Sequence, residues 1–252
     1  MSLSVLALEF PPVSHLVNWP DLGGGFNKIA AIYVFAVVAT MLLFLLGGKG
    51  NLVQSGAQNV AEAGLDFVQE NIVMQTIGPD GMKFMPLFTT MFFFIFFSNI
   101  TEIIPGVQMP ANARMAMPIT MALMVWLIYN VAGVVNQGPL HYLKNSLFPP
   151  GVPKALYLLV TPIEFVSTFI VRPFSLAVRL FANMMAGHLL LVTFAVLCAA
   201  LWSKTPLLAI DAVSFPVLVG LTAFEILVAF LQAFIFTILT AVYIGGAMHP
   251  EH

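Results

Sequence analysis

Charged side chains are scarce in this chain. Only 8% of its 252 residues are Asp, Glu, Lys or Arg, whereas soluble domains carry about 25%. With 60% hydrophobic residues and a mean hydropathy of +0.98, the chain cannot cover itself with a charged surface. The deficit excludes an ordinary soluble domain and indicates a protein that crosses a membrane several times.

The sequence also lacks the signals of three other classes of protein. The formal net charge of −2 and the lack of charge blocks exclude an electrostatic footprint for nucleic acid. The single cysteine, Cys198, excludes a disulfide framework and a thiolate metal cluster. No Lys or Arg precedes Lys28, so residues 1–27 lack the basic region of a signal peptide and are expected to be a retained tail.

Long uncharged runs are present instead. The first expected span, residues 28–48, would form about 30 Å of helix, which matches the hydrocarbon thickness of a bilayer. Two more runs, 84–104 and 115–135, are joined by a short proline-containing connection. They predict a transmembrane hairpin over residues 84–135.

Two intervening segments are polar enough to stay outside the bilayer. Residues 51–75 predict an amphipathic helix that lies along the interface or against a partner, because apolar residues recur at helical spacing opposite an acidic stripe. The apolar positions are Val53, Val60, Gly64, Val68 and Ile72, and the acidic ones are Glu62, Asp66 and Glu70. Residues 138–154 are rich in proline and predict an interfacial loop on the cytoplasmic side.

The last hundred residues contain two runs that are too long for simple spans. Residues 155–202 and 212–244 would form straight helices of about 70 Å and about 50 Å, against a core of about 30 Å. Either the first run is broken into two spans, or both helices are tilted or curved. We favour two long tilted helices packed as a hairpin over residues 155–244, with a kink at Pro173.

The expected fold is therefore an all-α, polytopic membrane domain over residues 1–252 with five crossings and its termini on opposite sides. The distribution of basic residues favours an external N-terminus and a cytoplasmic C-terminus. On one side lie Lys49, Lys83, Lys144 and Lys154, and on the other lie Lys28, Arg114 and Lys204.

Ionisable residues lie inside these two long helices: Glu164, Arg172, Arg179, His188 and Glu225. Each costs from about 2.5 to more than 10 kcal/mol at membrane depth, so each is a candidate functional residue. Glu164 lies close enough to a helix end that snorkelling to the interface is an equal alternative. Arg179 lies about 25 residues from either end, where snorkelling is a poor explanation.

Helical phase groups these residues. At 100° per residue, Arg172, Arg179 and Ala186 lie within about 20° of one line, and Asn183 lies about 40° away. Small residues on this face, such as Ala182, would allow another helix to approach closely. On the final helix, Glu225, Gln232 and Tyr243 share a second polar face. Two polar stripes on adjacent helices indicate a hydrated path.

The chemistry of these groups differs. Arginine keeps its proton even when it is desolvated, so Arg179 is a fixed cation. His188 and Glu225 can exchange protons. Titratable groups on one stretch, a permanent cation in the middle and Glu164 toward the other membrane face predict two proton half-paths separated by an electrostatic barrier.

One motif is more specific than this pattern. The sequence Ser175-Leu-Ala-Val-Arg179-Leu-Phe-Ala-Asn183-Met, followed by Met185-Ala-Gly-His188, closely resembles the signature of the a subunit of F-type ATP synthases. That family forms the stator beside the rotating c-ring. The resemblance covers most of the chain, and the His-then-Glu order of His188 and Glu225 is similar to mitochondrial and alphaproteobacterial members.

The resemblance implies a role for each matching position. Arg179 corresponds to the essential arginine that faces each c-subunit carboxylate, and Asn183 to its partner one turn later. His188 and Glu225 resemble the interacting pair of the inlet path. The remaining implied path residues are Gln232 opposite the arginine, Glu164 at the outlet, and Asn99 and Glu102 at the inlet. Arg172 is less characteristic, and either supports the outlet or meets a lipid headgroup.

The resemblance also implies partners and a location. A family member is a proton-conducting subunit that is not catalytic on its own, in a bacterial inner membrane. Its partners are the c-ring, the peripheral-stalk b subunits, the rest of the F1Fo complex and membrane lipids, with no nucleic acid, cofactor or metal. The sequence leaves open the choice between H⁺ and Na⁺.

Other functional classes explain the intramembrane charges less well. A proton-coupled secondary transporter would show internal repeats and broken helices, and the sequence contains no such repeat. A haem-binding subunit needs paired axial ligands, but His188 has no partner histidine on a neighbouring span. A passive scaffold would not need Arg179 in the membrane.

Overall fold

A computed structural model describes residues 27–47, 56–104, 107, 109–148, 153, 156–201 and 208–248. Within these ranges the regular secondary structure is helical throughout, and five helices are long and apolar enough to cross a membrane. The predicted all-α, polytopic membrane fold is confirmed. The tail expected at residues 1–27 lies outside the described residues except for Asn27.

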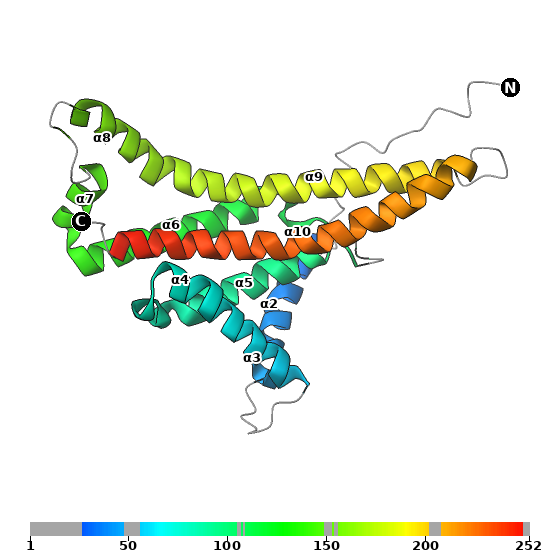
Figure 1. The fold of residues 1–252 in the computed structure, drawn as a ribbon, viewed down its shortest axis with the longest axis horizontal. Coiled ribbons are helices and arrows are strands. Elements are labelled where there is room, and N and C mark those ends of the chain that lie inside the picture. Colours follow the sequence, from blue (N-terminus) through cyan, green and yellow to red (C-terminus); the bar gives the residue numbers. More distant parts are fainter. Residues whose placement is uncertain are drawn as a thin grey trace.

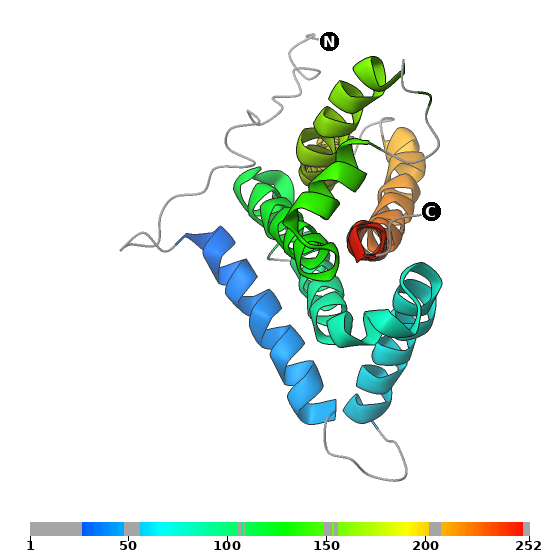
Figure 2. The same ribbon diagram turned by 90° about the vertical axis from the view of Figure 1, so that its left-hand side faces the viewer.

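The first span is helix α2, Lys28–Gly47. It is apolar on all sides, and it exposes large side chains such as Met41 and Leu45. A soluble protein would bury these side chains, whereas a helix in lipid has no reason to do so. Figure 2 shows α2 and α3 as two arms that converge at one end of the molecule.

Helix α3, Ala57–Val68, continues through a π-helical turn at Gln69–Val73 into α4, Met74–Thr76. The prediction of an amphipathic helix here was wrong for Val60, which is exposed, and Val53 lies outside the described residues. Instead the buried face runs through Ala61, Val68 and Ile72. Ala61 replaces Val60 because seven and eleven residues separate it from Val68 and Ile72, close to two and three full turns.

The transmembrane hairpin consists of α5, Met85–Ile100, and α6, Ala116–Gln137, with a 3₁₀ turn at Pro79–Phe84 before α5. Its connection packs into the protein. A second 3₁₀ turn, Ala111–Ala113, is almost completely buried and lies against α9. Ala111–Ala113 therefore forms part of the interior at this end of the bundle.

The segment expected as an interfacial loop, 138–154, instead begins with helix α7, Pro139–Leu147. Gly138 ends α6 with a positive φ of 84°, a conformation that glycine adopts without strain. Pro139 then occupies the first turn of α7, where its missing N–H costs nothing. The proline was a helix-start signal rather than a loop signal.

The second half of the molecule is a hairpin of two long helical segments. The first consists of α8, Tyr157–Val166, a π-helical turn at Ser167–Val171, and α9, Arg172–Leu201. The second is α10, Leu208–Met248. Figure 1 shows α9 and α10 side by side, and α8 bending away from α10. The first segment is bent but not broken.

The bend has a local cause at Pro173. In the π-helical turn the N–H of Arg172 donates to the carbonyl of Ser167, five residues earlier. Pro173 has no N–H, so the Thr168 carbonyl loses its other possible backbone donor in the helix. The hydroxyl of Tyr129 on α6 donates to this carbonyl instead. A kink was expected at Pro173, and the structure accommodates the proline by widening the preceding turn.

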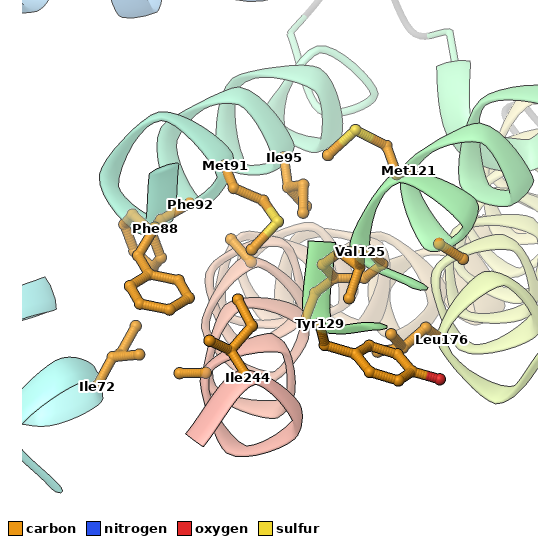
Figure 3. Close-up of a cluster of buried hydrophobic side chains, with 14 of the residues drawn as sticks. Ile72, Phe88, Met91, Phe92, Ile95, Met121, Val125, Tyr129, Leu176 and Ile244 are labelled. Carbon is orange, nitrogen blue, oxygen red and sulfur yellow. The ribbon is translucent and has the colours of Figure 1, made fainter. Parts of the chain in front are cut away.

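The core lies where α5, α6, α9 and α10 meet. Figure 3 shows Phe88, Met91 and Ile95 of α5 opposite Val125 of α6 and Ile244 of α10. Phe88, Ile95, Val125 and Ile244 are all at most 2% exposed. This core fixes the two long helices against the hairpin.

The helix ends group into two opposite sets. The Lys28 ammonium at the start of α2 donates to the carbonyl of Val107 in the α5–α6 connection, over 3.1 Å. At the other end of α6, the side-chain amide of Gln137 donates to the carbonyl of Ala247 near the end of α10, over 2.7 Å. The start of α2 and the end of α10 are therefore separated by the length of α6.

Candidate functional site

The arginine-bearing face of α9 is open. Arg179 is half-buried, and Ala182, Asn183 and Ala186 on the same side are exposed. Among the residues that the structure describes, no carboxylate lies within ion-pair distance of Arg179. An unpaired guanidinium is costly in lipid, which makes Arg179 a candidate functional residue.

Gln232 of α10 connects the two long helices at the level of the arginine. Its side-chain N–H donates to the backbone carbonyl of Arg179 over 2.8 Å, and its side-chain oxygen accepts from the Asn183 amide over 3.0 Å. Gln232 is buried, so both of its polar atoms need these partners. The amide therefore fixes the register of α10 against the turn of α9 that carries Arg179.

A buried ion pair lies on the other side of α9. Nδ1 of His188 is 3.3 Å from Oε1 of Glu102, which follows the end of α5. The two residues are 7% and 4% exposed. The resemblance implied that His188 interacts with Glu225, but its ion pair within the described residues is with Glu102. The contact is an ion pair only when the imidazole is protonated.

Glu225 of α10 completes this cluster. It is 7% exposed, and its carboxylate packs on the backbone of Gly187, where an added Cβ would overlap with it. A small cavity of about 10 Å³, enough for about one water molecule, is lined by Glu102 and Glu225 together with Asn99 and Gln232. Gly187 thus leaves room on α9 for an acidic side chain from α10.

Asn99 belongs to a second buried network that the sequence did not reveal. The amide of Asn112, in the α5–α6 connection, donates to Oδ1 of Asn99 over 2.7 Å. The hydroxyl of Tyr33 on α2 donates to Oδ1 of Asn112 over 3.1 Å. Asn112 is 1% exposed. No periodic pattern marks it, because it lies in an irregular connection, and an Asn two residues after Pro110 is typical of an ordinary turn.

Arg172 lies on α9 on the opposite side of Arg179 from His188 along the helix. Its guanidinium carbon is 5.3 Å from the centroid of the Tyr243 ring on α10, in a cation–π arrangement. Tyr243 packs edge-on against Tyr129, whose hydroxyl holds the Thr168 carbonyl. Arg172 therefore packs against the Tyr243 ring, close in sequence to the bend of the helix.

Tyr142 of α7 extends this aromatic group. Its hydroxyl donates to Oδ1 of Asn130 over 3.0 Å, and its ring fills the space beside Gly133 on α6. Burial raises the pKa of the Tyr142 phenol above its usual value of 10.0. The phenol therefore keeps the proton that it donates.

Glu164 is not part of either group. It is half-buried on α8, beyond the π-helical turn and about 22 Å along the helix from Arg179. Of the sequence-predicted residues, Asn99, Glu102, Asn183, His188, Glu225 and Gln232 come together around one small region. Arg179 adjoins that region through Gln232, and Glu164 stands apart from it.

The arrangement places three titratable side chains beside a fixed cation. Two carboxyl groups and an imidazole are buried next to each other, a fixed guanidinium follows at the next level, and the helix face outside it is open. Within the described part of the chain, no group of three or more His, Cys, Asp or Glu side chains could hold a metal ion.

Known proteins are similar in sequence to this chain. Residues 29–245 match the family described as "ATP synthase A chain". The "ATP synthase subunit a" of Rhodococcus erythropolis is 43% identical over 256 residues, which cover 96% of this chain and 89% of that protein. The protein of the same name from Frankia alni is 42% identical over 243 residues, covering 93% and 84%. That of Rhodopseudomonas palustris is 40% identical over 244 residues, covering 95% and 96%.

Proposed function

The chain belongs to the ATP synthase A chain family, and we propose that it is the proton-translocating a subunit of the Fo sector, which exchanges protons with the carboxylates of a rotating c-ring. The observation that carries the proposal is the pair of faces on α9. One face exposes Arg179 without an anionic partner among the described residues, and the other buries His188 against Glu102.

The inlet half-channel uses the buried cluster. A proton enters at the end of the bundle where α5 ends and α9 approaches its C-terminus, and passes Glu102, His188 and Glu225 in turn. It then neutralises a c-ring carboxylate, which can rotate into lipid because it no longer carries charge. Asn99 and Asn112 hold the wall of this path through their mutual hydrogen bond.

The outlet half-channel lies on the other side of Arg179. A protonated c-ring carboxylate returns after nearly a full turn and meets the guanidinium, which favours its ionised form, so that it releases its proton. Glu164 receives the proton at the far end of the bundle, and Arg172 adds a second fixed positive charge on this side. Arg179 stays protonated and prevents a direct leak between the two half-channels.

The shape of the long helices suits a round partner. Figure 1 shows that α8 bends away from α10 at one end and that α9 runs alongside α10. The exposed small residues Ala182 and Ala186 allow another helix to approach this surface. A bent, open face with a central cation fits the flank of a ring of helical hairpins.

The remaining assignments follow from the same family membership. The subunit has no catalytic activity by itself and works within the F1Fo ATP synthase, with the b subunits of the peripheral stalk and membrane lipids as further partners. It is a multi-pass membrane protein. We place it in a bacterial inner membrane, with its N-terminus outside and its C-terminus in the cytoplasm.

Cysteine cross-linking tests this proposal on the intact complex. In a Cys198→Ala background, Ala182→Cys and Ala186→Cys should form disulfides with cysteines on the outer helix of the c subunit. Leu127→Cys is the matched control, because Leu127 on α6 is also exposed but lies on another helix. Failure of both α9 positions to cross-link, in a complex that assembles, would argue for a transporter that works without a ring.

A further inference from the structure

A series of hydrogen bonds connects α2 to the cavity beside Glu102. The Tyr33 hydroxyl on α2 donates to Oδ1 of Asn112 over 3.1 Å, and the Asn112 amide donates to Oδ1 of Asn99 over 2.7 Å. Asn99 and Glu102 both line the cavity of about 10 Å³. Tyr33 is therefore linked to this cavity through two buried amides, although the cavity lining includes no residue of α2.

Ser98 fixes the orientation of the Asn112 amide. The Ser98 hydroxyl donates to the Ile95 carbonyl over 2.9 Å, so its single proton is used in that bond and its oxygen can only accept from Asn112. The Asn112 amide nitrogen lies 3.1 Å from this oxygen. A reversed amide would place two oxygens together with no proton between them. The nitrogen of Asn112 therefore faces Ser98 and Asn99, and its oxygen faces Tyr33.

The orientation of Asn112 in turn determines that of Asn99. Because Oδ1 of Asn99 accepts from Asn112, this oxygen points to the α5–α6 connection, and the Asn99 amide nitrogen lies on another side of the planar amide. Asn99 is 3% exposed and borders the cavity, so bulk water does not reach its N–H groups. An N–H donor beside a carboxyl group favours the ionised form of that group.

Two carboxyl groups can respond to this donor. Glu102 and Glu225 line the cavity, and Nδ1 of His188 is 3.3 Å from Glu102. Arg179 adjoins the cavity through Gln232. On the side of α2, Lys28 donates to the Val107 carbonyl, and Arg114 lines a separate cavity beside Tyr33.

We infer that Tyr33 is a positioning residue for the proton inlet, an inference that rests on the proposed function. Through Asn112, the Tyr33 hydroxyl keeps the amide nitrogen of Asn99 turned toward the cavity. There the N–H group stabilises a carboxylate after its proton has left. Helix α2, which carries no residue of the proton path itself, thus influences how readily the path releases protons.

The Tyr33→Phe variant of the intact ATP synthase tests this inference. It keeps the ring, which stacks on Phe94, but removes the hydroxyl that donates to Asn112. ATP-driven pumping in inverted vesicles releases protons through this path into the vesicle interior, so the carboxyl groups must lose protons there. Without the Asn99 donor they lose them at higher pH. The internal pH of half-maximal pumping should rise by roughly 0.5–1 unit, the effect of one hydrogen bond to a carboxylate. A wild-type pH profile would overturn the inference.

Tyr142→Phe is the matched control. The Tyr142 hydroxyl also donates to an asparagine oxygen, Oδ1 of Asn130, over 3.0 Å, and neither residue lines the cavity. This variant loses the same kind of hydrogen bond, and its pH profile should match that of the wild type. Equal shifts in the two variants would mean a general effect of a lost hydrogen bond and would contradict the role of Tyr33.

A double-mutant cycle tests whether Tyr33 acts through Asn112. Asn112→Ala should shift the pH profile in the same direction, and Tyr33→Phe should add no further shift in that background. Additive shifts would overturn the positioning role. If Tyr33→Phe prevents assembly, Asn112→Ala decides the question, because an unshifted profile in that variant contradicts the inference equally.

Glu102→Gln separates failure of this inference from failure of the proposed function. If Glu102→Gln pumps protons as fast as the wild type, the proposed inlet is wrong and the role of Tyr33 falls with it. If Glu102→Gln slows pumping while Tyr33→Phe keeps the wild-type pH profile, the inlet stands and only the role of Tyr33 is refuted.

Discussion

The two halves of the contact between α9 and α10 hold different chemistry. In one half, Glu225 of α10 packs on Gly187 beside the His188–Glu102 pair, so three titratable side chains share a buried region. In the other half, Tyr243 of α10 packs under Arg172, which keeps its charge at every physiological pH. The same two helices thus present groups that change charge at one end and a group that does not at the other.

This difference explains why Arg179 lies between the halves. Gln232, whose amide donates to the Arg179 carbonyl, marks the boundary on α10. In the proposed mechanism, protons are exchanged on the Glu225 side, whereas fixed positive charge on the Arg172 side favours ionised carboxylates. An antiparallel hairpin separates the two environments with a single pair of helices.

Replacement of Arg179, which lies between the two halves, should have the largest effect on ATP synthesis. Arg179→Lys is expected to abolish proton-driven ATP synthesis while the complex still assembles, because lysine lacks the planar fork and can lose its proton when desolvated. ATP synthesis in inverted membrane vesicles measures the loss, and immunoblots of the purified complex measure assembly. Normal synthesis in this variant would refute the role of Arg179.

Replacement of the Glu225 carboxyl group should have the second-largest effect, a slower uptake of protons. Glu225→Gln keeps the shape of the side chain but removes its proton exchange, and is expected to slow proton uptake roughly tenfold or more. The matched variant in the other half, Tyr243→Phe, keeps the ring under Arg172 and should change the rate less than about twofold. Fluorescence-quenching assays of proton pumping compare the two, and equal losses would erase the contrast between the halves.

Crowding of the same carboxylate should have an intermediate effect. Gly187→Ala would place a Cβ where the Glu225 carboxylate lies and should slow proton pumping several-fold, although alanine favours a helix over glycine by about 1 kcal/mol. Gly220→Ala on α10, where a Cβ meets nothing within 4 Å, is the control. Partial recovery in a Gly187→Ala/Glu225→Asp double variant would support the steric cause, and its absence would point to another one.

Loss of the Tyr129 hydrogen bond at the bend between α8 and α9 should have the smallest effect, a modest loss of stability. Tyr129→Phe leaves the Thr168 carbonyl without its donor, which should destabilise the subunit by about 1–3 kcal/mol and lower the temperature at which the complex dissociates. Pro173→Ala restores a backbone N–H near this carbonyl, so the double variant should lose less stability than the single one. Additive losses, measured by thermal denaturation, would mean that Pro173 is not the reason for the Tyr129 contact.

The predictions from sequence that were wrong concern segments outside the two long helices. Pro139 was interpreted as a loop residue, but it begins α7 because the preceding Gly138 ends α6. Val60 was assigned to a buried stripe, but the tertiary contacts select Ala61 as the residue on that face. The first case is decided by the local conformation of Gly138, and the second by packing, which a short-range pattern does not contain.

The sequence alone determined the membrane class, the helical fold and the residues whose charge is too costly to be accidental, because hydrocarbon penalises every unpaired polar group wherever it lies. It placed Glu225, Gln232 and Tyr243 on one face through helical phase. Only the tertiary structure decided that His188 pairs with Glu102, that Gly187 makes room for Glu225 and that Asn112 holds Asn99. These contacts join segments 13 to 86 residues apart, and neither periodicity nor composition fixes which of them meet.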